Sequence, residues 1–181
     1  MTNSNSSNSP YILEMRNVSK TFPGVKALDQ INLRVKRGSV HALMGENGAG
    51  KSTLMKILYG IYIPDEGGEL ILDDKPFKPG RPIDAIRRGL TMVPQEISPA
   101  ANLTIADNFY LGREITKGKF FLNQKAMNEQ ASAILKELGV PMDVTEKMSD
   151  VSVAKAQLVA IATAVSNDAK VIIMDEPTTA L

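Results

Sequence analysis

One glycine-rich stretch of the sequence has the residue types and the spacing that suit binding of a phosphate chain. Residues 45–52 read G-E-N-G-A-G-K-S and match the pattern G-x-x-x-x-G-K-[ST]. Glycine permits positive φ and lets successive backbone N–H groups approach an anion closely. Lys51 adds a charge able to reach β and γ phosphate oxygens, and the Ser52 hydroxyl can bind Mg²⁺. The residues expected to line this nucleotide site are Gly45, Glu46, Asn47, Gly48, Ala49, Gly50, Lys51, Ser52 and Thr53.

An Asp-Glu pair near the end of the sequence is the second candidate for chemistry. The apolar run at residues 171–174 is followed directly by Asp175 and Glu176. Taken alone, this pattern is more typical of a strand that leaves the core for solvent. Paired with the glycine-rich loop, it predicts that Asp175 holds Mg²⁺ through water and that Glu176 orients or deprotonates the attacking water.

Hydrophobic periodicity predicts the strands and helices that must position these motifs. Period-two alternation or short apolar runs predict strands around residues 13–16, 31–35, 40–44, 70–72, 91–93 and 171–174. Helical spacing and capping residues predict helices around 52–59, 84–88, 104 onward, 123–138 and 152–166. The loop therefore lies between a strand and a helix, as phosphate binding requires. His41, the only histidine, falls on the strand before the loop and is interpreted as structural.

Composition narrows the class of protein. Lys and Arg number 21 against 20 Asp and Glu, which argues against a nucleic-acid-binding surface. The sequence has no cysteine, so disulfides and thiolate metal sites are excluded and a cytosolic protein is favoured. No apolar run reaches the roughly 18 residues that a membrane helix needs. Residues 1–10 are polar and are expected to form a disordered tail.

With these motifs in this order, residues 11–181 resemble the nucleotide-binding domain of ATP-binding-cassette (ABC) ATPases. The resemblance implies an α/β fold: a P-loop NTPase core with N-terminal antiparallel strands and an inserted α-helical subdomain. The core would comprise residues 11–97 and 166–181, and the subdomain residues 98–165. It also implies that Phe22 stacks on adenine. Gln95 would contact Mg²⁺ and the attacking water, which makes it catalytic together with Lys51 and Glu176.

Two segments resemble a narrower group, the ATPases of simple-sugar importers of the ribose and galactose type. They are residues 102–114, N-L-T-I-A-D-N-F-Y-L-G-R-E, and residues 167–181. This resemblance implies that Mg²⁺ and ATP are the cofactors and that hydrolysis drives sugar uptake. It implies a peripheral position on the cytoplasmic face of the cell membrane. The expected partners are transmembrane permease subunits, a second cassette fused in the parent protein and a separate solute-binding protein, with no nucleic acid.

Two departures from the family pattern affect the expected activity. The signature L-S-G-G-Q reads Val-Ser-Val-Ala-Lys here, at residues 151–155. Ser152 can still cap a helix and meet a phosphate, but Ala154 places a Cβ where backbone should approach that phosphate. The sequence also stops before the family's switch histidine, so it is expected to be truncated, with the C-terminal part of the domain missing. It would then bind ATP with little turnover on its own.

Two alternatives stay open at this point. Both are alternatives to the ATPase of a sugar importer. One is an ATP-binding module with little or no hydrolysis, and the other is an ABC ATPase of translation or DNA repair. The near-neutral charge and residues 102–114 count against the latter. A GTPase is less favoured because the sequence has no N-K-x-D guanine motif.

Overall fold

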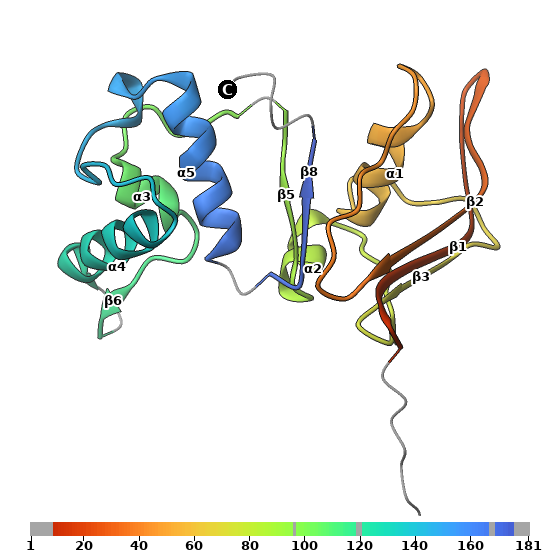
Figure 1. Cartoon of the computed structure of the whole chain (residues 1–181), viewed down its shortest axis with the longest axis horizontal. Coiled ribbons are helices and arrows are strands. Elements are labelled where there is room, and N and C mark those ends of the chain that lie inside the picture. Colours follow the sequence, from red (N-terminus) through yellow and green to blue (C-terminus); the bar gives the residue numbers. More distant parts are fainter. Residues whose placement is uncertain (1–8, 96, 119–120, 167–168, 176–181) are drawn as a thin grey trace, which may run out of the picture. The chain divides into compact units, whose positions relative to one another are not determined.

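The computed structural model describes residues 9–95, 97–118, 121–166 and 169–175. The chain divides into two compact units, Met1–Thr91 and Met92–Leu181. The first unit holds an antiparallel sheet with helices α1 and α2, and the second holds helices α3, α4 and α5 (Figure 1).

The sheet of the N-terminal unit has four antiparallel strands in the order β2-β1-β3-β4. Its strands are β1 (Tyr11–Phe22), β2 (Val25–Lys36), β3 (Glu69–Leu72) and β4 (Lys75–Pro76). A two-residue turn joins β1 to β2, so Phe22 lies opposite Val25 at the end of this hairpin. The antiparallel strands predicted near the N-terminus are confirmed.

Helix α1 (Lys51–Leu58) follows the glycine-rich loop and packs one face into the core of the same unit. Leu54, Met55, Ile57 and Leu58 are buried on it, at the predicted helical spacing. Because these four side chains anchor the helix, its N-terminus is held at the end of the loop. Helix α2 (Pro82–Arg87) begins with proline at its first position, where the missing N–H costs no helical hydrogen bond.

The C-terminal unit is built around three helices that share one apolar core: α3 (Ile105–Phe109), α4 (Gln124–Glu137) and α5 (Val153–Val165). The core side chains include Phe109 of α3, Met127 and Leu135 of α4 and Val159 of α5. The smaller elements are β5 (Leu90–Val93), which starts at the boundary of the units, β6 (Thr116–Lys117), β7 (Phe121–Leu122), the 3₁₀ turn Met148–Asp150 and β8 (Val171–Met174).

The helix caps predicted from the sequence are confirmed. The Thr104 hydroxyl accepts from the Asp107 backbone N–H at 3.1 Å, and the Asp107 carboxylate accepts from the Thr104 N–H at 3.2 Å. This reciprocal capping box satisfies two N–H groups that the helix leaves free. Asn123 caps α4 by accepting from Ala126 at 3.3 Å, and Ser152 caps α5.

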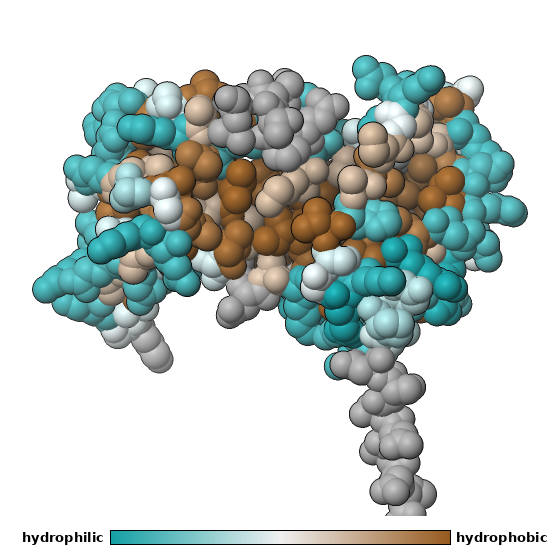
Figure 2. Space-filling view, in the orientation of Figure 1, coloured by the Kyte–Doolittle hydropathy of each residue, from teal (hydrophilic) through white to brown (hydrophobic). Residues whose placement is uncertain are grey.

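The strand predicted at residues 40–44 is wrong. Among the described strands none pairs with this segment, and Val40 and Met44 are exposed. An isolated strand leaves its N–H and C=O groups without a ladder, so an apolar run alone does not form one. His41, expected as a structural strand residue, is likewise exposed and outside any strand. Figure 2 shows hydrophobic side chains (brown) reaching the surface of the face in view.

The apolar run at residues 171–174 does form a strand, β8, which pairs with β5 in a two-stranded sheet. The run indicated a central strand with both faces covered. Within the described residues, however, Ile173 is buried whereas Met174 is 40% exposed. Successive side chains of a strand point to opposite faces of its sheet, so in the described part of the chain the face that carries Ile173 is covered and the face that carries Met174 is open to solvent.

Candidate functional site

The glycine-rich segment, residues 45–52, is called the phosphate loop from here on. Its residues from Gly45 to Ala49 are exposed, and the Ala49 N–H donates to the Glu46 carbonyl at 3.1 Å, which closes a tight turn. Gly48 and Gly50 both have positive φ, 86° and 85°. These glycines therefore allow the turn that a side chain would strain.

The N-terminus of α1 is open to an anion. Gly50 is its N-cap, and within α1, which is described in full, no side chain bonds to the cap and no acidic residue lies in the first turn. The N–H groups of the first turn of a helix have no partner inside the helix and carry the positive end of its dipole. Ser52 is exposed and Thr53 half-buried in this turn, so both lie beside the free N–H groups. This geometry suits a phosphate.

Lys51 bends back over the phosphate loop. Its Nζ donates to the carbonyl oxygens of Gly45 and Glu46, at 2.6 and 2.8 Å. These bonds hold the ammonium charge beside the N–H groups of the loop. An anion bound there can replace the two carbonyl groups as the partner of Lys51, because a charge-assisted bond to phosphate is stronger than one to a neutral carbonyl.

The phosphate loop is seated against strand β2 through Gly50. A Cβ at Gly50 would lie 2.6 Å from the carbonyl oxygen of Ala27 and 2.7 Å from Cδ2 of Leu28. At Gly48, by contrast, a Cβ would meet nothing within 4 Å. Gly50 is thus needed for close packing and for its φ, and Gly48 only for its φ.

Phe22, the predicted base-stacking residue, lies half-buried at the end of the β1–β2 hairpin. Its ring meets that of Tyr62 edge-on, with centroids 5.2 Å apart and planes at 73°. Lys20 Nζ lies over the Phe22 ring, 5.4 Å from its centroid. Sequence reasoning singled out neither residue; for Tyr62 the reason is that no motif marks a contact that spans 40 positions.

Gln95 and Asp175 are brought close together by the pairing of β5 with β8. The Asp175 N–H donates to the Val93 carbonyl at 3.1 Å, and Gln95 follows Val93 by two residues. Gln95 is exposed and Asp175 half-buried. Two side chains that carry oxygen atoms therefore follow the ends of neighbouring strands. Oxygen atoms are the ligands that Mg²⁺ prefers. Glu176, the predicted catalytic carboxylate, lies outside the described residues.

No protein cage for a metal is preformed in the described ranges, where no three His, Cys, Asp or Glu side chains could hold an ion together. Mg²⁺ in nucleotide sites takes one or two protein oxygens and completes its shell with water and phosphate. The predicted ligands Ser52, Gln95 and Asp175 offer a hydroxyl, an amide and a carboxylate, so their chemistry fits such an ion.

Ser152 of the altered signature lies exposed at the start of α5. Its Oγ accepts from the Lys155 N–H at 3.4 Å, a long bond that leaves the hydroxyl accessible. Val153 is exposed and Ala154 half-buried in the first turn. The cap predicted from sequence is therefore present, and the side chains that replace the family's glycines lie at the same helix end.

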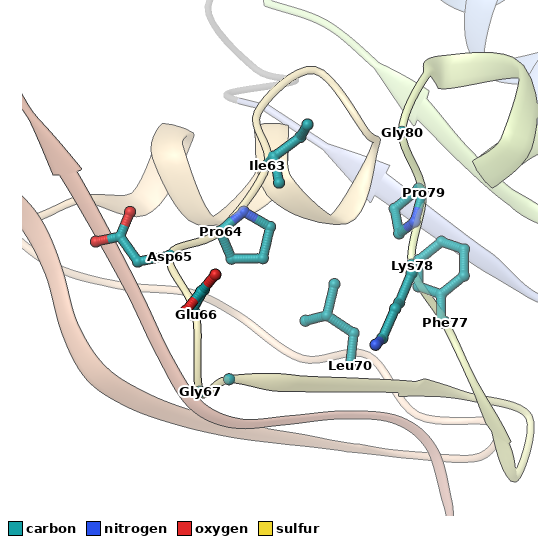
Figure 3. A pocket seen from close by; sticks show the side chains of 11 residues that line it. Ile63, Pro64, Asp65, Glu66, Gly67, Leu70, Phe77, Lys78, Pro79 and Gly80 are labelled. Atoms are coloured by element: carbon teal, nitrogen blue, oxygen red, sulfur yellow. The ribbon is translucent and has the colours of Figure 1, made fainter.

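A separate hollow of about 410 Å³ lies in the N-terminal unit. Figure 3 shows Pro64, Leu70, Phe77 and Pro79 around it, and none of the residues predicted for nucleotide binding lines it. Its walls come from the chain after α1 and the segment before α2. We assign no ligand to it.

Comparison with known proteins gives a family match and a set of relatives. Residues 28–179 match the ABC transporter family. An import ATP-binding protein of Geobacillus kaustophilus, named for ribose, galactose and methyl galactoside, is 50% identical over 94% of this chain and 34% of its own length. The galactose/methyl galactoside import ATP-binding protein MglA of Clostridium perfringens is also 50% identical, over 94% of this chain and 33% of its own. The chain thus spans about a third of these relatives.

A solved structure agrees with the fold. The crystal structure of an ATP-binding cassette of an ABC transporter in its ADP conformation superposes with a TM-score of 0.80. It is 28% identical, and the match covers 94% of this chain and 70% of that one. The antiparallel strands, the phosphate loop with its helix and the helical segment therefore belong to one known fold.

Proposed function

Since the chain belongs to the ABC transporter family, we propose that it binds ATP with Mg²⁺ and forms the ATP-binding part of an importer for a simple sugar. One observation carries the nucleotide site: a loop with two positive-φ glycines leads into an uncapped helix, with Lys51 folded over it. The names of two relatives that are each 50% identical support a sugar as the transported solute.

The proposed roles follow the chemistry of each group. The N–H groups of the phosphate loop and Lys51 bind the β and γ phosphates, and Phe22 stacks on the base. Mg²⁺, held through Ser52, Gln95 and Asp175, would neutralise phosphate charge. Glu176 orients the attacking water. Positioning and charge stabilisation then account for most of the rate of phosphoryl transfer.

We also propose the division of labour within the chain. Residues 11–97 and 166–181 form the nucleotide-binding core, and residues 98–165 form the helical subdomain that presents Ser152 to a nucleotide on a second cassette. The proposed partners are permease subunits, a second cassette and a solute-binding protein, at the cytoplasmic face of the membrane. No described helix is long and apolar enough to cross a membrane.

Calorimetry with MgATP tests the nucleotide site directly. The wild-type chain should bind MgATP, and Lys51→Ala should weaken binding at least tenfold, since a charge-assisted bond to phosphate contributes about 1.5–3 kcal/mol. Lys136→Ala is the matched control, because Lys136 is an exposed lysine in the last turn of α4 and belongs to no proposed site. A folded wild-type chain that binds no MgATP would overturn the proposal. Phosphate release measured on the same samples reports whether bound ATP is hydrolysed.

A further inference from the structure

The ring of Phe22, which is proposed to stack on the nucleotide base, is contacted from two sides. Tyr62 meets the ring at its edge and Lys20 lies over it. Phe22 is also the last residue of β1 before a two-residue turn, where a strand end would otherwise leave its side chain free to change rotamer. These contacts restrict the directions in which the ring can point.

Tyr62 is tied to the helix that carries the phosphate loop. The N–H groups of Ile61 and Tyr62 both donate to the Lys56 carbonyl of α1, at 2.8 and 3.2 Å. Lys56 Nζ lies 5.7 Å from the centroid of the Tyr62 ring. Helix α1 therefore has the phosphate loop at its N-terminus and Tyr62 just beyond its C-terminus, and it fixes the spacing between them.

Three further hydrogen bonds connect the chain after Tyr62 to the end of β1. Lys20 Nζ donates to the Ile63 carbonyl at 2.7 Å, and the Thr21 hydroxyl donates to the Asp65 carboxylate at 2.8 Å. The Asp65 N–H donates to the Ser19 carbonyl at 2.9 Å. Figure 3 shows the Asp65 side chain directed away from Leu70 and Phe77, which agrees with its bond to Thr21.

We propose that Tyr62 is a positioning residue for the nucleotide base. Held by α1, its ring sets the orientation of Phe22, so that Phe22 offers a purine the face opposite Lys20. This inference rests on the proposed function. A purine whose phosphates occupy the phosphate loop is tethered to that loop, so a ring already in place loses less conformational freedom on binding than a mobile one.

The test separates base recognition from phosphate binding. In Tyr62→Leu, calorimetry should show a Kd for MgATP about three- to tenfold higher, the range expected for an edge-to-face aromatic pair. The Kd for inorganic tripolyphosphate with Mg²⁺ should be unchanged, because this ligand has no base. Tyr62→Phe should bind both ligands as the wild type does, since the proposal uses the ring and not the hydroxyl.

A double-mutant cycle keeps the proposal falsifiable if Tyr62→Leu lowers stability. In a Phe22→Leu background, Tyr62→Leu should cause no further loss of ATP affinity, because Tyr62 acts through Phe22. An unchanged Kd for MgATP in Tyr62→Leu, an equal loss for ATP and tripolyphosphate, or additive losses in the cycle would each overturn it. A wild-type chain that binds neither ligand would instead refute the proposed function, and this inference with it.

Discussion

Replacing Gly50 by alanine tests whether the phosphate loop is seated on β2 as the structure describes. The added methyl would lie 2.6 Å from the Ala27 carbonyl oxygen and 2.7 Å from Leu28 Cδ2, closer than real Cβ contacts come. Leu28 can adjust its side chain, but the carbonyl is backbone within β2, so either the strand or the loop must shift. Gly48→Ala is the matched control, with the same sign and size of φ and open space around it.

The magnitude follows from two separate costs. A non-glycine residue with left-handed φ costs about 1–2 kcal/mol, and both variants incur this cost. Overpacking against a fixed neighbour costs about 1–3 kcal/mol more, and only Gly50→Ala incurs it. The free energy of unfolding should therefore fall by about 1–2 kcal/mol in Gly48→Ala and by about 2–5 kcal/mol in Gly50→Ala.

Urea unfolding followed by circular dichroism measures both variants against the wild type. The midpoint should fall further in Gly50→Ala than in Gly48→Ala, at an unchanged m-value, because the surface exposed on unfolding is the same. Equal losses in the two variants would show that no close contact with β2 exists at Gly50. The inferred packing of the phosphate loop against β2 would then be wrong.

Three further predictions concern caps and catalysis. Burial opposes ionisation of Asp107, but hydrogen bonds from Thr104 and Gln124 outweigh it and lower the Asp107 pKa. The ionised Asp107 carboxylate therefore stabilises the fold fully above the ordinary aspartate pKa, and this stabilisation is lost as pH falls through the lowered pKa. Melting curves at several pH values should show this loss of stability in acid. Thr104→Ala should make the loss smaller, because it removes one of the hydrogen bonds that lower the pKa. Asn123→Ala should lower the free energy of unfolding by about 1 kcal/mol in urea titrations, whereas exposed Lys125→Ala on the same helix should have little effect. Glu176→Gln should bind MgATP as tightly as the wild type in calorimetry while phosphate release falls; unchanged release would contradict the proposed role of Glu176.

Elements with a local cause could be predicted from the sequence. The capping box at Thr104, the Asn123 cap and the start of α5 at Ser152 depend on a side chain and a backbone N–H three residues away, and all three are confirmed. The phosphate loop is predictable for a similar reason. Glycine at fixed spacing permits the backbone shape that the loop needs, and Lys51 follows within the same turn.

Elements that need a distant partner could not be predicted in the same way. The run at residues 40–44 is apolar enough for a strand, but a strand forms only when another supplies its hydrogen bonds, and the sequence of the run does not specify one. The contact of Phe22 with Tyr62, the seat of Gly50 on Ala27 and the approach of Asp175 to Val93 are likewise decided by packing.

The sequence by itself therefore determined which residues of this protein can do chemistry, since their types and near spacing limit what each short segment can bind. Tertiary structure alone decided what surrounds those residues. Pairing of β5 with β8 places Asp175 beside Val93, and the chain after α1 returns to β1 to hold Phe22. Contacts across tens of residues depend on the loop-closure entropy and packing of the whole unit, which no short pattern of residues encodes.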